Sequence, residues 1–184
     1  MTEKRPPVPE FSRPILLDSL GEGREFVLEI HAGTEERAAL ARRFGLVALD
    51  SLTAAITATR TARGDVRLAG RLKAHVVQTC VVTLEPVPAA IETEFVRLFS
   101  PTATWDESEE IVLAPEDDDP PEPLTGGTVD PGEVAAETLG LALDPFPRAP
   151  GATLPPQASN SDEKENIPEK QGVFSVLAKL KERR

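Results

Sequence analysis

The stretch that decides the fold is LDSLTAAITATRTARGDVRLAGRLKAHV, residues 49–76. Apolar and polar side chains alternate over residues 49–61, and they alternate again over residues 66–76 after the short sequence Ala-Arg-Gly-Asp. A period of two is typical of a strand with one buried face, and glycine in a short polar connection favours a hairpin. We therefore predict two antiparallel strands joined by a turn at Gly64.

Three neighbouring segments extend this hairpin into an α+β domain, an antiparallel β meander with a short helix packed on it. They are the predicted strands at residues 24–32 and 89–99 and the predicted helix at residues 34–44. Thr34 is expected to cap the helix, Gly45 to end it, and Leu40 and Phe44 to face the core.

Prolines and acidic residues are concentrated in the second half of the chain. Asp130, Pro131 and Glu133 are typical of a helix start, so a second helix is expected there. We expect five parts: a flexible arm at 1–14, the α+β core at 15–100, an acidic loop plus a helix docking on the core at 101–150, a disordered linker at 151–172, and a short amphipathic helix at 173–184.

The net charge of −11 is spread unevenly along the 184 residues. Acids and bases cancel up to Arg97, and the whole acidic excess follows it. An acidic chain repels phosphate backbones unless its basic groups gather in one place, so a basic partner fits it better. The candidate partner-binding residues are an acidic run and the apolar face of the last helix: Glu116, Asp117, Asp118, Asp119, Phe174, Leu177 and Leu180. That helix can dock either on the core or on a partner.

The basic side chains around the hairpin are the candidate nucleic-acid contacts. We call this set the basic stripe: Arg60, Arg63, Arg67, Arg71 and Lys73. The competing interpretation is a solvated face balanced by acids, with Lys73 nearly opposite Glu94 and with Arg71 or His75 close to Glu92. The stripe also lacks the aromatic side chains on which single-stranded nucleic acids stack.

Cys80 is the only cysteine, so its role bears on any enzymatic interpretation. A catalytic thiolate needs a nearby base, and His75 lies an odd number of residues away on the same predicted strand, hence on the other face. We interpret Cys80 as a packing residue. We expect no catalytic residue, cofactor or metal site, and no small-molecule substrate, although an enzyme with an unrecognised site remains a third class. No signal peptide or long apolar span is visible, so we expect a cytoplasmic protein without membrane contact.

Three ordered motifs resemble the YceD family, the large ribosomal RNA subunit accumulation proteins. They are QTCVVTLEPV (78–87) followed by IETEFVRLF, the acidic stretch leading into VDPGEVAAETLGLALDPFPRAPG (129–151), and VFSVLAKLKERR (173–184). Many members carry Cys-x-Arg-Cys-Leu-x-Pro, whereas this chain has Val82 and Thr83 in place of the arginine and the second cysteine. A two-cysteine metal or redox role therefore cannot operate here.

The resemblance implies a factor needed for synthesis, processing or stability of large-subunit ribosomal RNA. Together with the charge, it leads us to expect a non-enzymatic protein that binds a basic ribosomal protein or assembly factor and engages ribosomal RNA directly or indirectly. The alternative is a direct RNA binder that uses the basic stripe.

Overall fold

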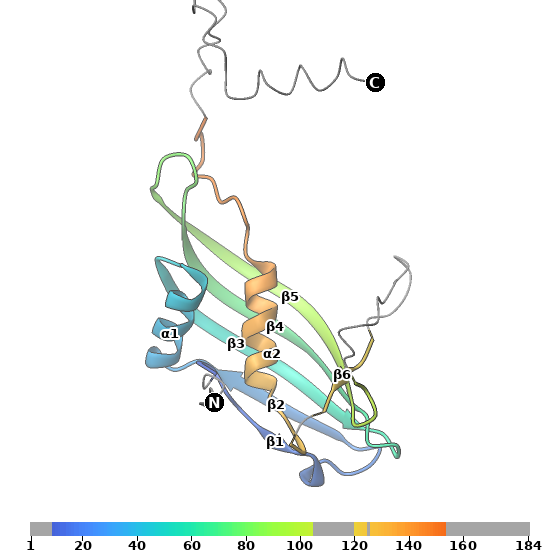
Figure 1. Cartoon of the computed structure of the whole chain (residues 1–184). Helices are drawn as coiled ribbons and strands as arrows, with labels where there is room; N and C mark the ends of the chain where they lie inside the picture. The colour runs from blue at the N-terminus through green and yellow to red at the C-terminus, as the bar shows by residue number, and fades with distance from the viewer. Residues whose placement is uncertain (1–8, 105–119, 125, 154–184) are drawn as a thin grey trace, which may run out of the picture. The chain divides into compact units, whose positions relative to one another are not determined.

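The computed structural model describes residues 9–104, 120–124 and 126–153, and these form an α+β fold, as the sequence predicts (Figure 1). The predicted acidic run at 116–119 and the predicted helix at 173–184 lie outside the described residues. Apart from a short 3-10 turn at Leu17–Ser19, the elements are β1 (Ile15–Leu16), β2 (Glu25–His31), α1 (Thr34–Phe44), β3 (Ala48–Arg60), β4 (Val66–Thr79), β5 (Pro86–Ser100), β6 (Glu122–Pro123), β7 (Thr128–Val129) and α2 (Pro131–Ala142).

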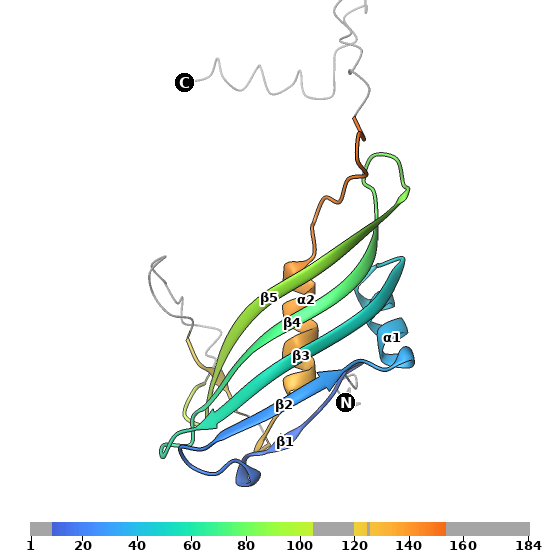
Figure 2. The same ribbon diagram turned by 180° about the vertical axis from the view of Figure 1, so that it is seen from behind.

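The main sheet has the strand order β2-β3-β4-β5-β6. Strands β2 to β5 form the predicted antiparallel meander, and β6 adds a short parallel pairing at the end of β5. The β3–β4 hairpin turns over residues 61–65, where Gly64 has φ = 90°, a conformation that suits glycine. Both helices lie on one face of the sheet, in front of it in Figure 1 and behind it in Figure 2.

The core fills the space between the sheet and the two helices. The side chains that alternate toward the helices are the buried ones, as the period of two predicts. From the two central strands they are Leu52, Ala54, Ile56, Ala58, Val66, Leu68, Leu72, Ala74 and Val76, and the helices contribute Leu40, Val134, Ala135 and Leu139.

Two glycines allow close approaches inside this core. A Cβ on Gly70 of β4 would lie 2.7 Å from the carbonyl oxygen of Ala55 and 2.8 Å from the ring of Phe95. A Cβ on Gly140 of α2 would lie 2.9 Å from the ring of Phe44, so α2 packs directly against α1. The bare backbone at these positions lets aromatic rings lie against strand and helix.

The start of α1 differs from the prediction. Gly33, not Thr34, is the N-cap residue, and its N–H donates to the Glu36 carboxylate at 2.7 Å. The acid three residues into the helix therefore satisfies the cap donor, and no side chain at the cap position does so. The predicted end is confirmed, because Gly45 adopts the left-handed conformation at φ = 64°.

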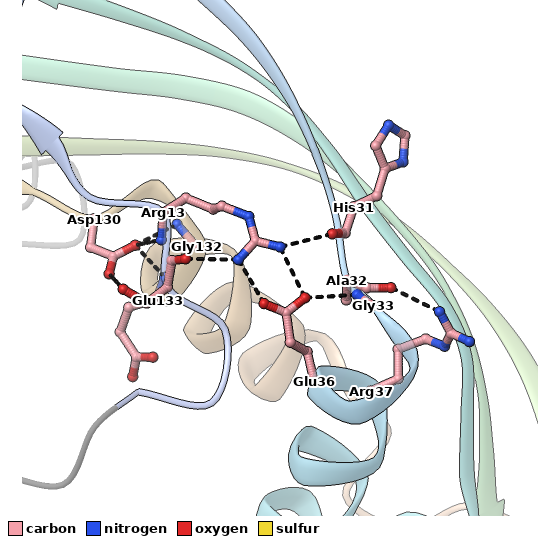
Figure 3. A network of polar contacts seen from close by, with 10 residues as sticks. Arg13, His31, Ala32, Gly33, Glu36, Arg37, Asp130, Gly132 and Glu133 are labelled. Carbon is pink, nitrogen blue, oxygen red and sulfur yellow. Dashed lines mark hydrogen bonds and ion pairs between the residues drawn. The ribbon is translucent and has the colours of Figure 1, made fainter.

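The residues that precede β1 fasten the two helices to each other (Figure 3). Asp130 caps α2 and also accepts hydrogen bonds from the Arg13 N–H at 2.7 Å and from the Ser12 hydroxyl. The Arg13 guanidinium then forms two bonds to the Glu36 carboxylate of α1, at 2.6 and 2.9 Å. Phe11 is fully buried, so part of the segment expected as a flexible arm lies in the packed core.

Candidate functional site

The side of the β2–β5 sheet that points away from the helices carries the polar residues of the alternation, and we call it the outer face (Figure 2). No helix or strand within the described ranges covers it. Across its middle lie Thr53, Ala55, Thr57, Arg67, Ala69, Arg71, Lys73, Glu92, Glu94 and Val96.

Two members of the basic stripe form ion pairs with acids on the neighbouring strand. Arg71 lies 2.6 Å from Glu94 and 3.4 Å from Glu92, and Lys73 lies 3.2 Å from Glu92. The acids Glu94 and Glu92 raise the pKa of Arg71. Since all four side chains are more than half exposed, solvent screens these pairs and they add little stability, but together they neutralise this part of the face.

The prediction that Arg71 lies close to Glu92 is confirmed, whereas the partner predicted for Lys73 is wrong by two residues. Lys73 is opposite Glu92, not Glu94, and Arg71 is opposite Glu94. The cause is the connection, because β4 runs to Thr79 and β5 begins at Pro86, which moves the centre of the hairpin toward the N-terminus. The third candidate, His75, lies opposite Ala90 and its ring is 2.9 Å from the Ser51 hydroxyl.

The other three members of the stripe do not form one surface. The Arg60 guanidinium donates to the carbonyl oxygen of Leu17 at 2.9 Å and lies 4.0 Å from Asp18. Arg63 is exposed in the β3–β4 turn, and Arg67 is exposed on the outer face. Within the described part of the chain, neither of these two forms an ion pair.

Small side chains leave a depression at the centre of the outer face. A hollow of about 380 Å³ lies over Ala55 and Ala69, and Val27, Arg67 and Val96 are among the residues around it. Val27 is 70% exposed and Val96 is 54% exposed. The hollow is shallow and open, whereas a small-molecule site buries most of its ligand, and the Arg71 and Glu94 side chains beside it are already paired with each other.

Cys80 lies one residue after the end of β4, in the connection to β5, and it is fully buried. Its sulfur accepts hydrogen bonds from the backbone N–H groups of Val82 at 3.4 Å, Thr83 at 3.3 Å and Ala149 at 3.3 Å. Although it is buried, the side chain is not a member of the main apolar cluster. It organises a turn, a polar structural role that the packing interpretation did not include.

The chain after α2 completes the surroundings of Cys80. Val81 donates its N–H to the carbonyl oxygen of Pro147 at 2.9 Å, and the Gln78 amide donates to the carbonyl oxygen of Asp144 at 2.9 Å. Leu84 closes the turn with φ = 62°, uncommon for a residue with a side chain. Residues 144–149 and the β4–β5 turn thus hold each other in place.

These hydrogen bonds favour the thiolate form of Cys80. The Thr83 hydroxyl, which also lies 3.2 Å from the Glu85 carboxylate, and the three N–H groups lower the pKa of Cys80 to about 6, while burial acts in the opposite direction. A thiolate without an accessible surface cannot reach a substrate. No group of three or more metal-ligating side chains occurs among the described residues.

An apolar groove separates the end of α2 from the neighbouring strand β5. It has a volume of about 260 Å³ and is lined by Thr93, Phe95, Arg97, Thr138, Leu141 and Ala142, among others. Leu141 is 78% exposed. The spacing of Glu133, Glu137 and Leu141, four residues apart on one side of the helix, is the signal that could have marked this leucine as exposed.

Glu137 lies one turn before Leu141 on the same side of α2 and is exposed. Burial and the nearby acids Glu122 and Glu133 raise its pKa, and Arg97 and Arg43 only partly compensate. The end of the groove near Glu137 therefore has an excess of negative charge.

The comparison with protein families matches residues 68–181 to YceD, described as large ribosomal RNA subunit accumulation protein. The chain belongs to the YceD family. The match begins in β4 and includes β5, the Cys80 turn and α2. Neither the comparison with curated proteins nor that with solved structures gives a match. Within the described ranges, no helix has the length and apolar character needed to cross a bilayer.

Proposed function

We propose that this YceD-family chain is a non-catalytic factor that supports the accumulation of large-subunit ribosomal RNA by holding a basic ribosomal or assembly protein. The observation that carries the proposal is the charge distribution, because residues 98–147 contain 13 acidic side chains and no basic one. Such a segment attracts a cationic protein and repels a phosphate backbone. Ribosomal RNA would displace the bound protein as the subunit assembles.

The arrangement of the basic stripe supports this choice over direct RNA binding. Arg71 and Lys73 are engaged by Glu92 and Glu94, so a phosphate that bound them would have to break those pairs and approach two carboxylates. Arg60 is held against Leu17 and Asp18. The RNA-binding alternative therefore depends on Arg63 and Arg67 rather than on five cooperating cations.

The test offers the full chain two ligands separately. One is the RNA-free mixture of basic proteins extracted from large ribosomal subunits, and the other is large-subunit ribosomal RNA. Binding is measured at several salt concentrations, because phosphate contacts release counterions and give a steep salt dependence. We expect capture of one or a few proteins from the mixture and only weak RNA binding. Tight RNA binding that weakens steeply with salt and is lost in R63A/R67A, without protein capture, would refute the proposal.

A matched pair of variants assigns the capture to the acidic run. The variant E116Q/D117N/D118N/D119N removes four charges from the run. The control E22Q/E25Q/E35Q/D50N removes four charges from exposed acids of the first half that form no ion pair among the described residues. Capture is expected to weaken in the first variant and to persist in the control. Equal loss in both would mean that only the total charge matters.

A further inference from the structure

The free edge of β5 is the longest unpaired strand edge in the described part of the sheet. β5 spans Pro86–Ser100, yet its pairing with β6 involves only Phe99 and Ser100. In Figure 2 the remainder of β5 is the outermost strand of the sheet. Pro86 and Pro88 have no N–H, so the edge available for pairing is residues 89–98, which we call the β5 edge. Alternate residues of such an edge present N–H and C=O groups away from the sheet.

Both sides of the β5 edge have features that would receive the side chains of an added strand. On the helix side lies the groove beside α2, with exposed Leu141 and, one turn earlier, the negatively charged Glu137. On the outer face lie Glu92 and Glu94, and Val96, which is 54% exposed. Strand addition derives its affinity from main-chain hydrogen bonds and its specificity from pockets for alternate side chains, and this edge offers both.

The charges decide which strand can occupy the edge. A second copy of this chain would bring its own Glu92 and Glu94 close to the same residues, and the ion pairs of these acids with Arg71 and Lys73 reduce this repulsion without supplying a cation for Glu137. The chain's own residues 105–119 contain eight acids and no base, so they would meet charge of the same sign. An extended segment with apolar and basic side chains has the complementary chemistry.

The geometry points to the β5 edge as the place where an extended, basic and apolar segment of the protein partner adds to the sheet as a further strand. Its apolar side chain covers Leu141 in the groove, a basic side chain lies by Glu137, and its backbone pairs with residues 89–98. This inference rests on the proposed function, since it names the site at which the basic partner is held.

The experiment measures amide hydrogen exchange of the full chain alone and after it has captured protein from the RNA-free mixture of large-subunit basic proteins. The outward N–H groups of the β5 edge are unpaired and should exchange quickly in the free chain. We expect at least a tenfold slowing over residues 89–98 in the complex. Capture accompanied by unchanged exchange in β5 would refute this inference and leave the proposed function standing, whereas absence of capture would refute both.

A matched pair of substitutions tests the groove. Leu141→Ser removes an apolar side chain that is 78% exposed, and the control Val47→Ser removes one that is 58% exposed in the α1–β3 connection. Both positions make little contact in the free chain, so folding should persist in each variant. Loss of one buried leucine predicts capture weaker by roughly tenfold for Leu141→Ser, and no change for Val47→Ser. Equal capture by the two variants would overturn the assignment.

Discussion

Replacement of Gly70 by alanine tests how closely the sheet and its core are packed. Gly70 lies opposite Phe95 on β5 and Ile56 on β3. The added methyl carbon would lie 2.7 Å from the carbonyl oxygen of Ala55, 2.8 Å from the Phe95 ring and 3.1 Å from Ile56. The first neighbour is backbone in the middle of a sheet, so the clash cannot be relieved by rotating one side chain.

The expected cost follows from these contacts. Overpacking a core by one methyl group destabilises by about 1–3 kcal/mol. Replacing glycine also reduces the conformational entropy of the unfolded chain. This stabilises the folded state by less than about 1 kcal/mol and does not offset the clash. For a chain of this size, the midpoint of thermal unfolding should fall by roughly 3–10 °C.

The assay is thermal and urea unfolding of Gly70→Ala followed by circular dichroism. Gly21→Ala is the control, because its new carbon would meet only the flexible Arg24 side chain, at 3.2 Å. In the background of Gly70→Ala, Phe95→Leu should cost less than it does alone, since it removes one of the clashing groups. A Gly70→Ala protein as stable as the unmodified chain would refute the packing argument.

Three further changes have defined outcomes. Arg13→Ala breaks the two hydrogen bonds to Glu36, and Arg13 is the main cause of the lowered pKa of that carboxyl. The variant should therefore lose the most stability above pH 4.5, the pKa of the unfolded carboxyl, and the loss should disappear as the pH falls through the lower pKa of the folded state. Urea titrations at several pH values measure this difference. Cys80→Ser should destabilise by about 1–3 kcal/mol in urea. It should also abolish the rise in stability between pH 6 and 9, which is expected because the Cys80 thiol has a pKa of about 6 in the folded chain and of 9.0 in the unfolded chain. Iodoacetamide should alkylate Cys80 no faster than the turn opens, because the sulfur is buried; labelling at the rate of a free thiol would contradict this.

The meander was predictable because its hairpin combines a glycine turn with a period of two that is interrupted only at a bulge between Leu49 and Ser51. Buried and exposed residues of β3 and β4 alternate as expected, and the same parity placed Arg71 and Lys73 beside acids. The register was not predictable, because it depends on how many residues the β4–β5 connection uses. Val81 and Val82 resemble a continuation of the strand, although β4 ends at Thr79.

The long-range hydrogen bonds of single polar residues could not be predicted from the sequence either. Asp130 signals a helix start, but nothing local shows that its carboxylate also binds Ser12 and Arg13, more than a hundred residues away. The sequence likewise does not reveal that the segment after α2 donates the Ala149 N–H to Cys80. The free β5 edge follows from strand order and not from any motif.

The most direct test of the account is crosslinking in cells that express the full chain, followed by identification of every attached protein and RNA. The account predicts adducts with one or a few basic proteins of the large ribosomal subunit or its assembly, with crosslinks that persist in R63A/R67A. Adducts with ribosomal RNA at the basic stripe, in the absence of any basic protein, would contradict it.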